Sequence, residues 1–116
     1  MLDSPELLRV LLDECLPKKI KREFVDCVVS TVPEMGWAGK KNGELMKVAH
    51  DQFDVFVTAD QNLRYQQNLS YADIGVIVLV AVNNRIETLA PLMPRVNEAL
   101  KSIAAGQVVE IKIETD

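Results

Sequence analysis

The sequence contains little cysteine, no long apolar stretch and no excess of positive charge. Two cysteines in 116 residues are too few for a small domain built around several disulfides. The longest apolar stretch runs from Ile74 to Val82, whereas a membrane-spanning helix needs about 20 apolar residues. We therefore expect no membrane association, and we expect Cys15 and Cys27 to be small residues in or near the core.

Acidic residues outnumber basic ones, with 13 Lys and Arg against 17 Asp and Glu and a formal net charge of -4. A domain that holds nucleic acid through its overall charge is normally basic. Any nucleic-acid binding would therefore need a local basic patch or a bound cation. The start of the chain, from Met1 to Glu6, has neither the basic region nor the apolar run of a secretory signal. Together with the low cysteine count, this predicts a cytoplasmic protein.

The composition, 48% hydrophobic and 26% charged, is that of a globular protein, and the length suits one domain over residues 1–116. Short apolar segments typical of strands alternate with segments of helical periodicity. We expect strands at about 8–12, 27–32, 53–58, 75–80 and 108–113, and helices from Pro17 to Phe24, at 44–50 and at 85–104. This alternation favours an α/β fold, a three-layer α/β/α sandwich with a mostly parallel central sheet of about five strands.

Several segments refine this expectation. The run from Gly75 to Val80 is the most apolar and should be a central or deeply buried strand. Segment 108–113 alternates as an edge strand with one wet face does. Pro91 and Pro94 fall in or near the first turns of the last helix, which should begin late or break there. We expect Trp37, in a glycine-rich loop, to anchor that loop on the core.

Two of the predicted strands end on acidic residues. The first runs into Asp13 and Glu14, and the third runs through Thr58 into Asp60. Ligands of open α/β sheets bind beyond the carboxyl ends of the strands. If the two strands are neighbours, their terminal carboxylates converge on one crevice. Glu44 begins the helix before the third strand and would have to face the same crevice.

Clustered carboxylates repel one another unless a cation lies among them, and hard oxygen ligands suit Mg²⁺ or Mn²⁺. Such a metal could orient a phosphodiester, activate a water and stabilise the leaving oxygen. The spacing alone leaves an alternative open, in which Asp13 and Asp60 only cap the segments that follow them. Glu14 could equally be a surface acid.

Three segments resemble a known family. They are Leu-Asp-Glu-x-Leu-Pro at 12–17, the loop and helix start from Gly36 to Leu45, and Val-Thr-Ala-Asp-Gln-Asn-Leu at 57–63. In this order and spacing they resemble the short PIN-like domains called domain of unknown function 5615, over nearly the whole chain. The resemblance implies an α/β/α sandwich and a ribonuclease that depends on Mg²⁺ or Mn²⁺. Many prokaryotic members of the PIN family are toxins of toxin–antitoxin pairs.

The same resemblance assigns roles to individual residues. It implies that Asp13, Glu44 and Asp60 are the catalytic residues and the metal ligands, and that Thr58 orients Asp60 or a metal-bound water. It also implies RNA as the substrate, an antitoxin protein as a candidate partner and a homodimer as a candidate assembly.

One position departs from the family pattern. Asn62 stands where many PIN sequences have another acid. Asparagine offers an oxygen ligand but no charge, so a second metal ion should bind less well. Glu14 could take the place of the acid that is missing at position 62. Asn62 therefore favours a second hypothesis, a catalytically weak or inactive PIN-like module that binds a partner protein or RNA. A receiver-type phosphoacceptor domain fits less well, because residues 81–85 after the late strand contain no lysine.

Polar and basic side chains near the predicted site could contact RNA. Three lysines could contact phosphates, and three residues after the Thr-x-Asp motif could contact the bases of a single strand. These candidates are Lys18, Lys40, Lys41, Arg64, Tyr65 and Gln66. A solvated helix face and an ordered polar loop are the alternative explanations for the same residues.

Overall fold

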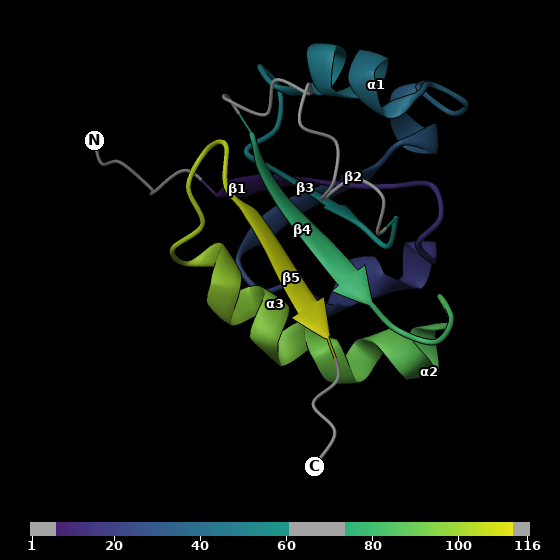
Figure 1. The fold of residues 1–116 in the computed structure, drawn as a ribbon, viewed down its shortest axis with the longest axis vertical. Coiled ribbons are helices and arrows are strands. Elements are labelled where there is room, and N and C mark those ends of the chain that lie inside the picture. The colour runs from purple at the N-terminus through teal and green to yellow at the C-terminus, as the bar shows by residue number, and fades with distance from the viewer. Residues whose placement is uncertain (1–6, 61–73, 113–116) are drawn as a thin grey trace.

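Five parallel strands form one sheet in the computed structural model, which describes residues 7–60 and 74–112 (Figure 1). The described strands are β1 (Leu8–Leu12), β2 (Cys27–Thr31), β3 (Val55–Thr58), β4 (Gly75–Val80) and β5 (Val108–Lys112). Their order across the sheet is β2-β1-β3-β4-β5, and every neighbouring pair is parallel. The predicted α/β fold with a parallel five-stranded sheet is thus confirmed.

Apolar side chains alternate between two cores, one on each face of the sheet. Val55 and Val57 of β3 pack into one core and Phe56 into the other, and all three are buried. Residues of α2 (Ile86–Leu89), η4 (Ala90–Leu92), α3 (Met93–Leu100) and the 3-10 helix η1 (Lys18–Glu23) cover the first core, and α1 (Asn42–Ala49) covers the second. Figure 1 shows α1 on one side of the sheet and α2 and α3 on the other. Strands buried on both faces explain the near-continuous apolar runs in the sequence.

The helix predicted over 85–104 is divided into α2, η4 and α3. Pro91 lies at the start of η4 and Pro94 at the start of α3, where a residue without an N–H group interrupts no hydrogen bond of the helix it begins. The regular helix ends at Leu100, earlier than predicted, and the chain turns through Gly106, at φ +84°, to enter β5. The break expected from the two prolines is confirmed, whereas the predicted length of the helix is wrong.

Smaller differences concern the ends of other elements. The helix predicted after Pro17 is the 3-10 helix η1, which is followed by an extended residue at Phe24. The strand predicted at 53–58 begins at Val55, and Phe53 before it packs edge-on against Trp37 with ring centroids 6.1 Å apart. Trp37 is therefore the predicted loop anchor. A further 3-10 helix, η2 (Pro33–Met35), precedes that loop.

The positions of the strands within the sheet agree with the sequence predictions. Five of the six residues of β4 are buried, as predicted for a central or deeply buried strand, and β3 lies at the centre of the sheet. β5 lies at one edge, as its alternating pattern indicated, and β2 lies at the other edge. β1 and β3 are neighbours, which was the condition for their terminal acids to meet.

Candidate functional site

The order of the strands changes direction between β1 and β3. From β1 the chain passes to β2 on one side, and it then returns to add β3, β4 and β5 on the other side. In open α/β sheets the ligand crevice lies at the carboxyl ends of the strands at such a switch point. Leu12 pairs with Val57 across the two strands, so the residues that follow each strand lie side by side there.

A short hydrogen bond joins the two strand ends at this point. The Thr58 hydroxyl donates to Asp13 Oδ2 over 2.6 Å, and Thr58 is fully buried. The backbone N–H of Asp13 donates to the carbonyl oxygen of Val57 over 2.9 Å, which continues the ladder one residue beyond β1. Hydrogen bonds to a carboxylate are shorter and stronger than neutral ones. Thr58 therefore fixes the orientation of the Asp13 side chain.

The same hydroxyl oxygen also holds the backbone of the second acid. Thr58 Oγ1 accepts the backbone N–H of Asp60 over 3.0 Å. This explains the spacing of the Thr-x-Asp motif, since a threonine side chain can accept an N–H two residues further along the chain. One buried hydroxyl thus links Asp13 and Asp60, which are both partly buried.

The charge of Asp13 is not neutralised by a cationic side chain among the described residues. Its hydrogen bonds come from neutral donors, among them the Thr58 hydroxyl on Oδ2 and the backbone N–H of Glu14 on Oδ1, the latter at 2.8 Å. A carboxylate offers about four lone-pair positions. Asp13 therefore has the capacity to accept a further ligand.

Glu14 does not join this pair of carboxylates but reaches a loop. Glu14 Oε1 accepts the backbone N–H of Gly39 over 2.9 Å. The sequence suggested that Glu14 could replace the acid missing at position 62. The structure instead connects Glu14 to the glycine-rich loop that leads into α1.

Glu44 lies in the first turn of α1, and its side chain is exposed. An acid in this position interacts favourably with the helix dipole whatever its other role. In the ranges 7–60 and 74–112, no three Asp, Glu, His or Cys side chains form a group that could hold a metal ion. The structure thus brings Asp13 and Asp60 together through Thr58 and does not place Glu44 in the same group.

The prediction of residues in or near the core is confirmed for Cys27, which packs against the first core, and is wrong for Cys15. Cys15 is exposed, because it lies in the turn that follows β1, and Cys27 is partly buried. The Cys15 sulfur is nonetheless 3.9 Å from Thr58 Oγ1. Partial burial of the sulfur raises the pKa of the Cys15 thiol, and the nearby charge of Asp13 adds to this increase. The thiol is therefore protonated at neutral pH, and the donors available at this site are hard oxygens.

Two lysines of η1 form ion pairs with Glu34. Lys21 Nζ lies 2.9 Å from Glu34 Oε1, and Lys18 Nζ lies 3.4 Å from Glu34 Oε2. The Lys21 hydrogen bonds, followed by one from the backbone of Thr31, lower the pKa of Glu34 to about 2. Lys18, a candidate for contact with RNA phosphates, therefore already forms an ion pair with Glu34.

The remaining candidates lie on the loop before α1 or beyond the described residues. Lys40 is partly buried and Lys41 is exposed, and Lys41 directly precedes the first residue of α1. Both follow Gly39 in the loop that Glu14 contacts. Asn62 and the candidates for contact with RNA bases lie outside the described residues; these candidates are Arg64, Tyr65 and Gln66.

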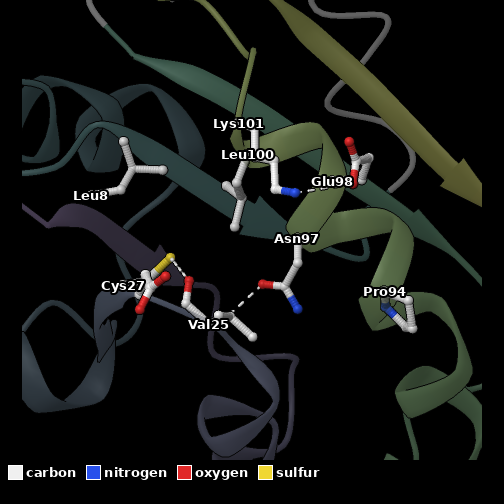
Figure 2. A pocket seen from close by; sticks show the side chains of 9 residues that line it. Leu8, Val25, Cys27, Pro94, Asn97, Glu98, Leu100 and Lys101 are labelled. Carbon is white, nitrogen blue, oxygen red and sulfur yellow. Dashed lines mark hydrogen bonds and ion pairs between the residues drawn. The ribbon is translucent and has the colours of Figure 1, made fainter.

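A cavity of about 350 Å³ opens at the other end of the sheet, where β1 and β2 begin and α3 ends (Figure 2). Asn97 bridges α3 to the start of β2 there: its Oδ1 accepts the N–H of Val25 over 3.1 Å, and its Nδ2 donates to the carbonyl of Glu23 over 2.9 Å. The cavity walls include Leu8, Pro94 and Leu100. The sequence analysis missed Asn97, because a single asparagine within a helical pattern carries no signal of a contact 72 residues away.

Comparison of the chain with protein-family models, with curated proteins and with solved structures gave no match. The resemblance to PIN-like domains thus stays a prediction that rests on the motifs in the sequence. Within the described part of the chain, none of the helices has the length and apolar character needed to cross a membrane.

Proposed function

We propose that this chain is a ribonuclease of the PIN type that depends on Mg²⁺ or Mn²⁺ and acts in the cytoplasm. The observation that supports the proposal best is the link from Asp13 to Asp60 through the buried Thr58 hydroxyl. This link lies at the switch point of a parallel sheet, which is where α/β proteins bind their ligands.

The chemistry of these donors fits the proposed metal ion. Carboxylate oxygens are the hard ligands that Mg²⁺ prefers, and in phosphoryl-transfer enzymes one or two carboxylates suffice, since waters and substrate phosphates fill the other positions. Asp13 and Asp60 would hold the ion, and Glu44, in the first turn of α1, is the third acid that the resemblance implies. A bound ion would activate water and neutralise charge on the phosphodiester.

The residues around the two acids would orient them and hold the substrate. Thr58 would keep the Asp13 carboxylate in one orientation, so that no side-chain freedom is lost when RNA binds. Lys40 and Lys41 would contact RNA phosphates, which carry no sequence information but position the strand. As the toxin of a toxin–antitoxin pair, the protein would be inhibited by an antitoxin protein that covers this edge.

The proposal is tested by incubating the purified chain with a labelled single-stranded RNA and Mn²⁺. Replacing Asp60 by Asn should lower the cleavage rate about a hundredfold or more, because a charged metal ligand is lost. The control Asp51→Asn makes the same chemical change at an exposed residue at the end of α1 and should cleave like the unchanged chain. Absence of both cleavage and Mn²⁺ binding at millimolar Mn²⁺ would contradict the proposal.

A second candidate function is a catalytically inactive module that binds a partner protein. Leu7, Val25 and Val28 are exposed at the amino ends of β1 and β2, and exposed apolar groups of this kind mark interaction surfaces when they lie together. This surface could form a homodimer. The Val28→Lys variant would then dissociate into monomers, as measured by sedimentation equilibrium. Dimerisation that survives Val28→Lys, or a monomer in the unchanged chain, would exclude that dimer. Cleavage lost in Asp60→Asn would favour the ribonuclease.

A further inference from the structure

Glu14 contacts both the proposed site and the loop at residues 36–41, which we call the glycine loop. Its backbone N–H donates to Asp13 Oδ1 over 2.8 Å, and its side-chain Oε1 accepts the N–H of Gly39 over 2.9 Å. The second contact joins residues that are 25 positions apart in the sequence. It therefore ties the carboxyl end of β1 to the glycine loop.

The glycine loop is built to hold one conformation. Gly36 and Gly39 have φ angles of +78° and +87°, which side chains with a Cβ rarely adopt. At the start of the loop, the Trp37 ring packs against Phe53, and the Trp37 backbone N–H donates to the carbonyl of Val32 over 3.1 Å. Trp37 fixes the first half of the loop, and Glu14 holds its second half.

The second half of the loop carries the charges that suit RNA. Lys40 and Lys41 follow Gly39 directly, and the carbonyl of Lys41 accepts the N–H of Leu45 over 2.8 Å at the start of α1. The contact made by Glu14 therefore lies one residue from the first of these lysines. A backbone N–H held by a charged acceptor forms a stronger bond than one held by a neutral acceptor.

We propose that Glu14 is a positioning residue, which holds the glycine loop against the carboxyl end of β1 and so places Lys40 and Lys41 beside the phosphates of bound RNA. The inference rests on the proposed function. It assigns Glu14 a role different from that of a metal ligand or a surface acid. Removing a surface acid beside an RNA-binding site strengthens RNA binding, because a repulsive charge disappears. Removing Glu14 should instead weaken it.

The contact itself is tested without RNA. In Glu14→Ala, amide hydrogen exchange at Gly39 should rise about tenfold, because a hydrogen bond to a charged acceptor is lost. Trypsin should also cleave faster after Lys40 and Lys41. In Glu14→Gln a neutral oxygen acceptor remains, so both measurements should change much less than in Glu14→Ala. Exchange at Gly39 that is the same in all three proteins would overturn the inference.

The role in RNA binding is tested by steady-state cleavage with Mn²⁺. Glu14→Ala should raise KM for single-stranded RNA about tenfold and change kcat less than about twofold, since binding is weakened equally in the ground and transition states. Glu14→Gln should restore KM. The control Glu87→Ala removes the same charge from an exposed position on α2 and should leave KM unchanged or slightly lower.

The other outcomes separate this inference from the proposed function. A kcat that falls in both Glu14→Ala and Glu14→Gln would show a metal ligand, and a KM that falls in Glu14→Ala would show a repulsive surface acid. Either result overturns the positioning role and leaves the ribonuclease in place. An unchanged chain that neither cleaves nor binds RNA overturns both, even where Gly39 exchange responds to Glu14→Ala.

Discussion

The two ends of the sheet differ in chemistry, although the same strands form both. At the carboxyl end, a buried hydroxyl links Asp13 and Asp60 through hydrogen bonds of 2.6 and 3.0 Å. At the amino end lies a cavity of about 350 Å³ with largely apolar walls, and Val25 beside it is 62% exposed. The cavity alone would suggest a functional site at the amino end. The hydrogen-bonded polar groups and the switch point suggest a site at the carboxyl end.

The acids at the two ends also differ in how their charge is balanced. At the amino end, Asp54 lies 3.5 Å from the guanidinium of Arg9 and accepts the Arg9 backbone N–H. At the carboxyl end, Asp13 accepts hydrogen bonds from neutral donors. A carboxylate that already has a cationic partner has less to gain from a metal ion than one that has none. The difference indicates that the carboxyl end of the sheet is better suited to a cation than the amino end.

Among the variants that distinguish the two ends of the sheet, Thr58→Val should have the largest effect on stability and RNA cleavage. It removes the hydroxyl and keeps the shape of the side chain. The Asp60 N–H then lacks its acceptor, so the free energy of unfolding should fall by about 1–3 kcal/mol, and RNA cleavage should fall about tenfold because Asp13 loses its fixed orientation. Urea denaturation and the cleavage assay measure both effects. Thr58→Ser keeps the hydroxyl and is the matched control. Equal losses in the two variants would contradict the role of the hydrogen bonds.

A smaller effect, confined to stability, is expected at the amino end from Asn97→Ala. The variant loses the hydrogen bonds to the backbone of Val25 and Glu23, which should lower the free energy of unfolding by about 1–2 kcal/mol. Metal binding and RNA cleavage should be unchanged under conditions where the variant is folded. A cleavage rate that falls in the folded Asn97→Ala protein would show that the amino end takes part in the reaction.

The smallest effect is expected from Glu34, whose pKa is lowered from 4.5 to about 2 by the hydrogen bonds from Lys21 and the Thr31 backbone. Because the folded-state pKa is depressed, the stabilising contribution is present above pH 4.5 and is lost as the pH falls toward 2. The Tm of the unchanged chain should therefore exceed that of Glu34→Gln at neutral pH, and the difference should vanish near pH 2. A difference that is constant from pH 2 to 7 would contradict this assignment.

The parts of the structure that follow from local patterns were predictable from the sequence. Gly75–Val80 was predicted with its observed ends, because a continuous apolar run of this length is typical of a strand buried on both faces. Asp13 and Asp60 were predictable as candidate site residues for the same reason, since each apolar run stops at or near an acid. The break at Pro91 and Pro94 was predictable from the missing N–H groups.

The contacts that complete the site depend on residues far apart in the chain. The bond from Thr58 to Asp13 spans 45 positions, and no periodicity in either segment indicates it. Glu14 next to Asp13 suggested a ligand, but its partner is Gly39 in a loop whose path depends on the packing of Trp37. Acids are common in the first turn of a helix, so the position of Glu44 alone could not show whether it joins the site.

We propose that the carboxyl ends of β1 and β3 bind a divalent metal ion and that the amino ends do not. The most direct test is to add Mn²⁺ below equimolar amounts and record which backbone amide signals the paramagnetic ion broadens in the NMR spectrum. We expect selective broadening at Glu14, Ala59 and Asp60, lost in Asp13→Asn, with the signals of Val25 and Cys27 unaffected. Broadening centred on Val25 and Cys27, or none at millimolar Mn²⁺, would contradict it.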